Sequence, residues 1–207
     1  MDHLDRRVHW EKVYSTKPEQ QVSWFQEKPA VSLDLIHATN VSRTAAIIDV
    51  GGGASRLVDA LVGEGYRSVT VLDLSETALA ISRARLGSKA SEVEWITGDV
   101  MNWEPTTFFD VWHDRATFHF LTEAEERTAY VSTLAKALRV GGHAIISTFA
   151  LDGPKRCSGL PVERYDATSL GNALGPAFRL IQTQRHEHLT PMGGTQRFQF
   201  SWFERAK

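Results

Sequence analysis

AAIIDVGGGASRLVDALV, residues 45–62, is the stretch that decides the fold of this chain. Small and apolar residues surround Asp49 and predict a buried parallel strand over residues 45–50. Three glycines follow at positions 51–53, and without Cβ atoms the backbone can turn sharply there and approach a ligand closely. Ser55 is a favourable N-cap, and apolar residues recur on one face of the segment after it. The stretch therefore predicts a strand, a glycine turn and a helix whose N-terminus offers free N–H groups to a ligand.

The spacing of the glycines distinguishes between ligands. The dinucleotide fingerprint G-x-G-x-x-G fails at its third glycine, where this chain has Arg56. The D-x-G-x-G pattern of Asp49, Gly51 and Gly53 instead resembles the first motif of class I S-adenosylmethionine (SAM) methyltransferases. In that family the glycines lie against the methionine end of the cofactor, and the acid helps to hold its ammonium group, usually through water. The resemblance implies that Asp49, Gly51, Gly52 and Gly53 bind SAM; a glycine turn with only a structural role is the alternative.

Two more acids follow predicted strands, at the edge of a parallel sheet where ligands bind. Asp73 comes after a strand over residues 68–72 and is placed to accept hydrogen bonds from ribose hydroxyls. Asp99 follows a strand over residues 93–97 and resembles the third element of the same family, whose aspartate receives the adenine amino group. The backbone N–H of the next residue then meets a ring nitrogen. A helix-capping Asp73 and a plain turn at Asp99 are the alternatives. The predicted cofactor contacts here are Asp73, Leu74, Asp99 and Val100.

Composition limits the class of protein. A chain of 207 residues with 42% hydrophobic residues can form one core, and its net charge of −2, without Lys/Arg runs, argues against nucleic acid or a membrane surface as partner. Cys157 is the only cysteine, so an internal disulfide is excluded and a reducing compartment is expected. The N-terminus lacks an apolar signal region, and no apolar run reaches membrane-spanning length. We therefore expect a cytoplasmic protein.

The remaining elements complete a familiar architecture. We expect a fourth strand over residues 108–113, a helix to Leu138 with a capping box at Thr122 and Glu125, and a fifth strand over 143–149. Gly141 and Gly142 are expected to stop that helix. Strands near 178–188 and 195–203 are expected to form a terminal hairpin around Pro191–Gly194. The fold class predicted is α/β: a Rossmann-like methyltransferase sheet of seven strands, mostly parallel with an antiparallel C-terminal strand, and helices on both faces.

We expect one domain, residues 1–207, in three parts. Residues 1–44, with short helices over 5–14 and 29–37 and an aromatic Trp24, form a helical lid over the cofactor; simple packing of the aromatic rings on the core is the alternative. Residues 45–150 form the cofactor-binding core. Residues 151–207 supply a substrate-capping loop with Tyr165, followed by the terminal hairpin.

The segment after the fourth strand is the candidate for chemistry. Its D-x-x-x-D-R-A pattern, ending in Asp114-Arg115-Ala116, resembles the signature of thiopurine methyltransferases and their small-thiol relatives, in which the Asp–Arg pair lines the cofactor and substrate pocket. It is also similar to the D-K-G-T segment of small protein-lysine methyltransferases. Arg115 is placed to stabilise a thiolate, and His113 or His119 to act as a base; a buried structural role is the alternative for each histidine. The predicted catalytic residues are His113, Asp114, Arg115 and His119, and Asp114 is also a predicted cofactor contact.

The function predicted is transfer of a methyl group from SAM to a small molecule, with a thiol favoured. SAM carries an activated methyl group, so the protein must align the acceptor and exclude water. Two alternatives stay open: methylation of a protein lysine, and a SAM-binding module without catalysis. His186 and His188 alternate onto one strand face without a third ligand, so no metal site is predicted.

Overall fold

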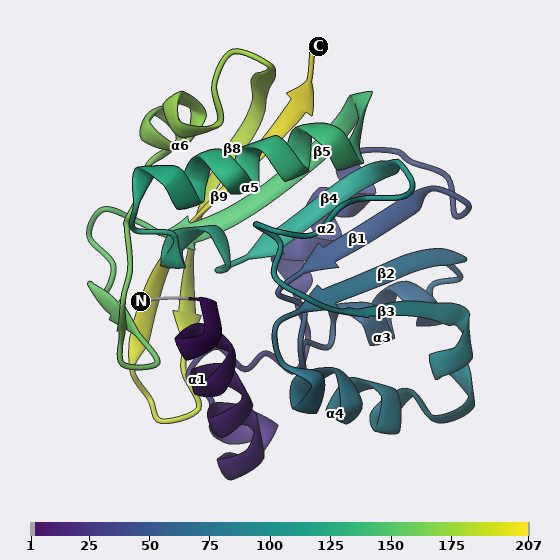
Figure 1. Ribbon diagram of the computed structural model, residues 1–207, viewed down its shortest axis with the longest axis vertical. Coiled ribbons are helices and arrows are strands. Elements are labelled where there is room, and N and C mark those ends of the chain that lie inside the picture. Colours follow the sequence, from purple (N-terminus) through teal and green to yellow (C-terminus); the bar gives the residue numbers. More distant parts are fainter. Residues whose placement is uncertain (1–2, 207) are drawn as a thin grey trace.

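The computed structural model describes residues 3–206 and contains the predicted sheet (Figure 1). Its strand order is β3-β2-β1-β4-β5-β9-β8. β9 is antiparallel to both of its neighbours, and the other pairings are parallel, which confirms the predicted fold class. The strands are β1 Ala46–Val50, β2 Ser68–Asp73, β3 Val93–Thr97, β4 Phe109–Arg115, β5 Leu138–Phe149, β8 Phe178–Leu189 and β9 Thr195–Arg205.

Helices cover both faces of this sheet, and α1 lies beside α4 near the carboxyl ends of β1 and β2 (Figure 1). The α-helices are α1 His3–Thr16, α2 Ala30–Ala38, α3 Leu57–Gly63, α4 Glu76–Leu86, α5 Ala124–Ala137 and α6 Ala167–Leu174. Short 3₁₀ helices lie at η1 Glu19–Gln21, η2 Gly87–Glu92 and η3 Phe118–Phe120. A two-stranded hairpin, β6 Arg156–Cys157 and β7 Leu160–Pro161, lies within the loop predicted to cap the substrate.

Two hydrophobic cores result from the alternation of side chains along the strands. Ile47 of β1 is fully buried in the core against α2, α3 and α4, whereas its neighbour Ile48 is buried against α5 and α6. Because both faces are covered, β1 reads as a continuous apolar run rather than an alternating one. The one interruption in that run is Asp49, which is 2% exposed. A buried carboxylate in a central strand requires polar partners, and these are described below.

Three local predictions are corrected by the structure. The capping box of α5 lies one residue later than predicted, at Glu123 and Glu126. That helix ends at Ala137, and β5 begins at the next residue. Gly141 and Gly142 therefore lie within β5 and do not stop the helix. Pairing of β4 with β5 shifts register across this stretch, and the positive φ of Gly141, 80°, accommodates the irregularity.

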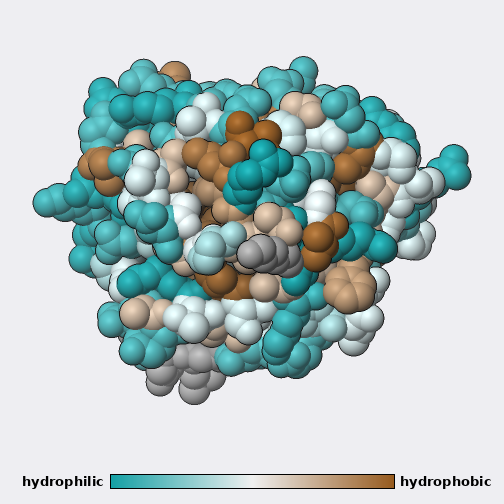
Figure 2. All heavy atoms as spheres, turned by 90° about the horizontal axis from the view of Figure 1, so that it is seen from above, coloured by the Kyte–Doolittle hydropathy of each residue, from teal (hydrophilic) through white to brown (hydrophobic). Residues whose placement is uncertain are grey.

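Hydrophilic side chains predominate on the face shown in Figure 2, where hydrophobic residues form small groups between them. Most large apolar side chains are instead used in the two cores. Across residues 3–206, none of the helices combines the length and hydropathy that crossing a membrane requires.

Candidate active site

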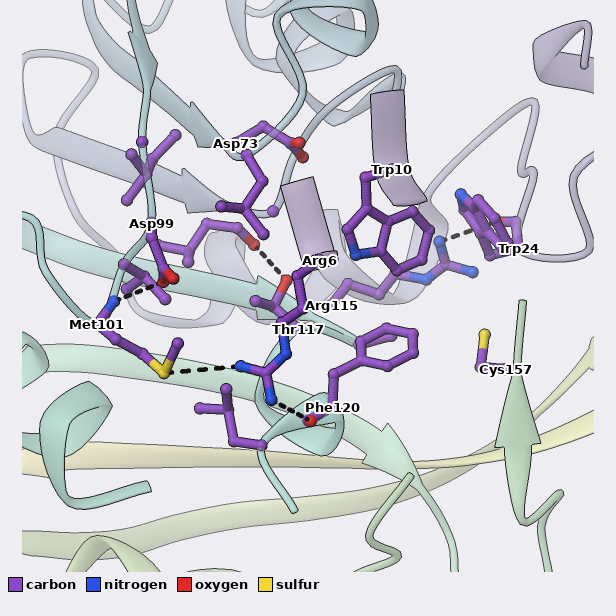
Figure 3. A pocket seen from close by; sticks show the side chains of 18 of the residues that line it. Arg6, Trp10, Trp24, Asp73, Asp99, Met101, Arg115, Thr117, Phe120 and Cys157 are labelled. Atoms are coloured by element: carbon purple, nitrogen blue, oxygen red, sulfur yellow. Dashed lines mark hydrogen bonds between the residues drawn. The ribbon is translucent and has the colours of Figure 1, made fainter. Parts of the chain in front are cut away.

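A pocket opens at the carboxyl edge of the sheet, below α1, and brings together segments from the whole chain (Figure 3). Its floor comes from the ends of β1, β2 and β4, and its cover from α1, the segment before α2, and β6. The lining residues are Arg6, Trp10, Tyr14, Trp24, Val50, Gly51, Leu72, Asp73, Leu74, Gly98, Asp99, Val100, Met101, Arg115, Ala116, Thr117, Phe120, Leu121, Cys157 and Phe198.

The glycine turn has space for backbone only. A Cβ at Gly51 would lie 1.8 Å from Oγ1 of Thr117, and φ there is +67°. A Cβ at Gly52 would lie 2.6 Å from Oδ2 of Asp49. A Cβ at Gly53 would lie 2.8 Å from a carboxylate oxygen of Asp73. Such contacts exclude side chains, so the turn brings backbone against the pocket and holds two carboxylates beside it.

Asp73 ends β2 and lines the pocket, with 8% of its surface exposed. Its Oδ1 accepts a hydrogen bond of 2.8 Å from the backbone N–H of Ser75. Burial, with the nearby charges of Asp49 and Glu11, raises the pKa of Asp73 to about 7, although the hydrogen bond from Ser75 opposes the shift. This carboxylate is therefore a strong acceptor held in an environment that has not fully compensated its charge.

Asp99 lies across the pocket from α1 and is 6% exposed (Figure 3). Its Oδ1 accepts a hydrogen bond of 2.9 Å from the backbone N–H of Met101. Val100 and Leu74 line the pocket beside it. The structure thus brings together acidic side chains from the ends of β2 and β3 with apolar residues between them, which suits a flat ring with polar edges.

Helix α1 covers the pocket with three side chains at intervals of four residues: Arg6, Trp10 and Tyr14. Trp10 contacts Trp24 and Phe120 edge to face, with ring centroids 5.6 and 5.2 Å apart. Arg6 donates to the Met101 sulfur at 3.8 Å and the Phe120 carbonyl at 3.5 Å, as Figure 3 shows, and pairs with Glu126 of α5. The aromatic rings cover the pocket on this side, and the hydrogen bonds of Arg6 connect the cover to the opposite wall.

Arg115 projects from the end of β4 toward this cover. Its Nη1 donates to the Trp24 carbonyl at 3.0 Å, and its guanidinium lies 5.4 Å from the ring centre of Phe198. Its Nε and Nη2 are buried without a hydrogen-bond partner in the described structure. Burial lowers the pKa of Arg115 to about 10, despite the opposing charge of Asp49. A buried guanidinium with two unused donors in a pocket is suited to an anionic ligand group.

The other predicted catalytic residues do not line the pocket. His113 is 1% exposed and uses both ring nitrogens: Nδ1 lies 2.7 Å from Oδ1 of Asp49, and Nε2 lies 2.9 Å from Oγ of Ser32. His119 is fully buried, and its Nδ1 accepts from the backbone N–H of Phe149 at 3.3 Å. Burial, with the charge of Arg115, lowers the pKa of His119 to about 3. Neither histidine is therefore placed to take a proton from an acceptor.

Asp114, which is predicted to contact both cofactor and acceptor, is not among the lining residues of this pocket. It is fully buried, and its oxygens accept from the backbone N–H groups of Thr117 and Phe118 at 2.7 and 3.0 Å. It also accepts a bond of 2.6 Å from the hydroxyl of Tyr130. Asp114 thus shapes the loop that carries Thr117 into the pocket. Tyr165, expected to cap the pocket, instead packs against Phe118 in the core beside α5.

Trp10 and Tyr14 belong to the N-terminal segment that is predicted to cover the cofactor, but Arg6, Cys157 and Phe198 are not predicted as lining residues. Arg6 has a detectable signal, because it shares one helix face with Trp10 and Tyr14. Cys157 and Phe198 reach the pocket from segments distant in the sequence, and no local pattern identifies them. Burial raises the pKa of Cys157 to about 12, so its thiol stays protonated. Among the described residues, no cluster of three His, Cys, Asp or Glu side chains is arranged to hold a metal ion.

The amino-acid sequence of this chain is similar to those of known methyltransferases. Residues 47–142 match a family model described as a methyltransferase domain. The chain is 25% identical over 185 residues to the EEF1A lysine methyltransferase 2 of Mus musculus, covering 81% of this chain and 72% of that protein. It is 24% identical over 151 residues to the eEF1A lysine and N-terminal methyltransferase of Bos taurus, covering 69% of this chain but only 21% of that one.

Solved structures agree on the fold. A structure from work on the conversion of a disulfide bond into a thioacetal group during echinomycin biosynthesis aligns with a TM-score of 0.77 and 21% identity, covering 97% of this chain and 93% of the other. The 1,6-didemethyltoxoflavin-N1-methyltransferase of Burkholderia thailandensis, bound to S-adenosylhomocysteine, aligns with a TM-score of 0.70 and 20% identity, covering 99% and 85%.

The sheet has the fold of the aligned methyltransferases, and residues 47–142 carry a methyltransferase domain, so the chain is a SAM-dependent methyltransferase. Its cofactor is SAM. This class does not support the alternative of a binding module without catalysis. The finer prediction, membership of the thiopurine and small-thiol group, finds no support among these relatives.

Proposed function

We propose that this enzyme methylates a small acceptor whose nucleophile ionises without help from the protein, with a thiol favoured. The observation that carries the proposal is the composition of the pocket: Arg115 supplies a buried positive charge, and both lining carboxylates, Asp73 and Asp99, are assigned to SAM in this proposal, which leaves the acceptor without a base.

The residues around the glycine turn fit SAM. In the proposed arrangement Asp73 accepts from the ribose hydroxyls, and Asp99 with Val100 binds the adenine edge. Asp49, behind the turn, attracts the ammonium group of the methionine end. SAM supplies a methyl group on a cationic sulfur, which needs no activation by the protein. What remains for the chain is to hold the acceptor in line and to exclude water, and the Trp10, Trp24 and Phe120 rings support this role.

The lack of a base restricts the acceptor. Burial raises the pKa of both Tyr14 and Cys157. Both groups therefore stay protonated near pH 7 and cannot take a proton from the acceptor. His113 and His119 lie outside the pocket lining. A free thiol, with a pKa near 8.5, is about 3% ionised at pH 7, whereas an amine with a pKa near 10.4 is less than about 0.1% deprotonated. A thiolate beside the Arg115 guanidinium is further stabilised by its charge.

A second candidate is methylation of a protein lysine. It is favoured by the curated relatives, which are named as lysine methyltransferases that act on eEF1A. The positive charge of Arg115 also favours the neutral amine of lysine over its ammonium form, and the neutral amine is the form that accepts a methyl group. A protein substrate must place a side chain into the pocket past the cover formed by α1.

A labelled-methyl assay distinguishes the two candidates. Purified enzyme is incubated with labelled SAM and a panel of small thiols, sulfide, phenols, amines and cell-lysate protein. We expect label in small thiols, and we expect Arg115→Gln to reduce kcat/KM for thiols at least about tenfold because thiolate stabilisation is lost. Cys157→Ser serves as a control in the same pocket, with activity retained. Label found only in protein would replace the thiol proposal with the lysine candidate.

A further inference from the structure

Asp49 has a hydrogen-bonding arrangement that the chemistry at Arg115 does not explain. It is the single charged residue in the apolar run of β1, and it lies under the glycine turn with Oδ2 buried and without a hydrogen-bond partner among residues 3–206. A Cβ at Gly52 would come within 2.6 Å of that oxygen. The other oxygen, Oδ1, is held by His113. One oxygen is therefore fixed, and the other remains directed at the backbone of the turn.

The hydrogen-bonded series that fixes Asp49 consists of three residues from three elements. In the parallel register of β1 and β4, Asp49 pairs with His113, so the two side chains leave the sheet on the same face. Helix α2 covers that face (Figure 1), and Ser32 is a buried residue of α2. Nδ1 of His113 lies 2.7 Å from Asp49 Oδ1, and Nε2 lies 2.9 Å from Ser32 Oγ. All three residues are at most 2% exposed.

This arrangement has the composition of a catalytic triad, but its burial excludes that use. Ser32 does not line the pocket and is 1% exposed, so its hydroxyl has no route to a substrate. An ionised carboxylate only accepts hydrogen bonds, so Nδ1 is the donor to Asp49. The Ser32 hydroxyl fixes the imidazole from the far side. In a catalytic triad the carboxylate orients the histidine. Here the order is reversed: Ser32 and His113 orient the carboxylate of Asp49.

We propose that His113 and Ser32 are positioning residues for SAM: they hold the Asp49 carboxylate in the one orientation that attracts the ammonium group of the cofactor across the glycine turn. The inference rests on the role proposed above for Asp49. A buried carboxylate without this support can rotate about its side-chain bonds or recruit water, and its electrostatic effect on the ligand decreases. The prediction of His113 as a base is replaced by this role, which acts through Asp49 and not on the acceptor.

The test compares two ligands that differ only at the end Asp49 is proposed to sense. S-adenosylhomocysteine carries the ammonium and carboxylate groups, whereas 5′-methylthioadenosine keeps the nucleoside and sulfur without them. Dissociation constants of both are measured by calorimetry for the full chain and for Asp49→Asn, His113→Leu, His113→Asn and Ser32→Ala. Binding of 5′-methylthioadenosine also reports whether each variant is folded.

We expect Asp49→Asn and His113→Leu each to weaken S-adenosylhomocysteine about tenfold while 5′-methylthioadenosine stays within about twofold. His113→Asn, whose side chain branches at Cγ with the same number of heavy atoms as in His113→Leu but keeps a donor near the Nδ1 position, should recover most of the affinity. Ser32→Ala should weaken S-adenosylhomocysteine about threefold, again without affecting the shorter ligand.

The outcomes distinguish the role of Asp49 in binding from the positioning role of His113 and Ser32. Unchanged S-adenosylhomocysteine binding in Asp49→Asn overturns the proposed role of Asp49, and the inference with it. A selective loss in Asp49→Asn without one in His113→Leu overturns only the positioning role. Equal loss of both ligands in His113→Leu, or an asparagine variant as weak as the leucine one, also overturns it. If His113→Leu does not fold, Ser32→Ala decides: selective loss supports the inference, and unchanged binding of both ligands contradicts it.

Discussion

At the scale of single residues, the site is built from carboxylates buried before any ligand compensates them. Asp73 shows the consequence most directly, because its pKa of about 7 lies well above the ordinary value near 4. Between those two values the folded state binds more protons than the unfolded state. The free energy of unfolding must therefore fall as pH rises from about 4 to about 7, as far as this group is concerned.

Asp73→Asn tests this account in the protein without cofactor. The variant keeps an acceptor for the N–H of Ser75 but never ionises. We expect its melting temperature to match the wild type near pH 4 and to exceed it by a few degrees at pH 8, where the wild-type carboxylate is charged. Asp34→Asn, at an exposed position on α2, is the control and should show no such trend. A difference that does not change with pH would contradict the burial of charge at Asp73.

At the scale of elements, α1 is fastened to the core through its polar side chains. Glu11 caps the N-terminus of α4: Oε1 accepts from the N–H of Glu76 at 2.7 Å, and Oε2 accepts from Thr77 N–H and Ser75 hydroxyl at 3.2 and 3.1 Å. Burial opposes ionisation of Glu11, but these hydrogen bonds outweigh it and lower its pKa. One side chain thus couples the cover of the pocket to the helix that follows Asp73.

Glu11→Gln should therefore loosen the cover more than it destabilises the fold. Loss of the charge and of one acceptor at a helix N-terminus costs about 0.5–2 kcal/mol. We expect S-adenosylhomocysteine to dissociate about three- to tenfold faster in a stopped-flow experiment, with a smaller change in the association rate. Lys12→Gln, at the adjacent exposed position on α1, should leave both rates unchanged. Equal dissociation rates in the two variants would mean that α1 does not control release.

Sequence reasoning succeeded for these elements where local chemistry decides the structure. The strand and the glycine turn around Gly51 follow from residues close in sequence, and both are present. The capping box of α5 was misplaced because Thr122 and Glu123 both precede suitable acids, and only packing selects between them. His113 looked like a base because its partner Ser32 lies 81 positions away, and sequence does not reveal that both ring nitrogens are occupied.

At the scale of the whole molecule, the pocket is lined by segments from both ends and the middle of the chain. Its lining runs from Arg6 in α1 to Phe198 in β9, and it includes the ends of β1, β2 and β4. A ligand bound there contacts both the cover and the sheet, so it stabilises only the state in which they are assembled. Unfolding of any one of these segments must therefore release the ligand, and binding is linked to the stability of the entire fold.

Saturation with S-adenosylhomocysteine should consequently raise the melting temperature of the full chain. At a ligand concentration of 100 times the dissociation constant, the added free energy of unfolding is about 2.7 kcal/mol. For a chain of 207 residues this corresponds to a shift of about 5–10 °C in differential scanning fluorimetry. Adenosine, which lacks the sulfur and the amino-acid end, gives the matched comparison and should produce a smaller shift at the same concentration. Equal shifts for the two ligands would mean that the methionine end adds no affinity, and that the carboxylate under the glycine turn has no ligand to attract.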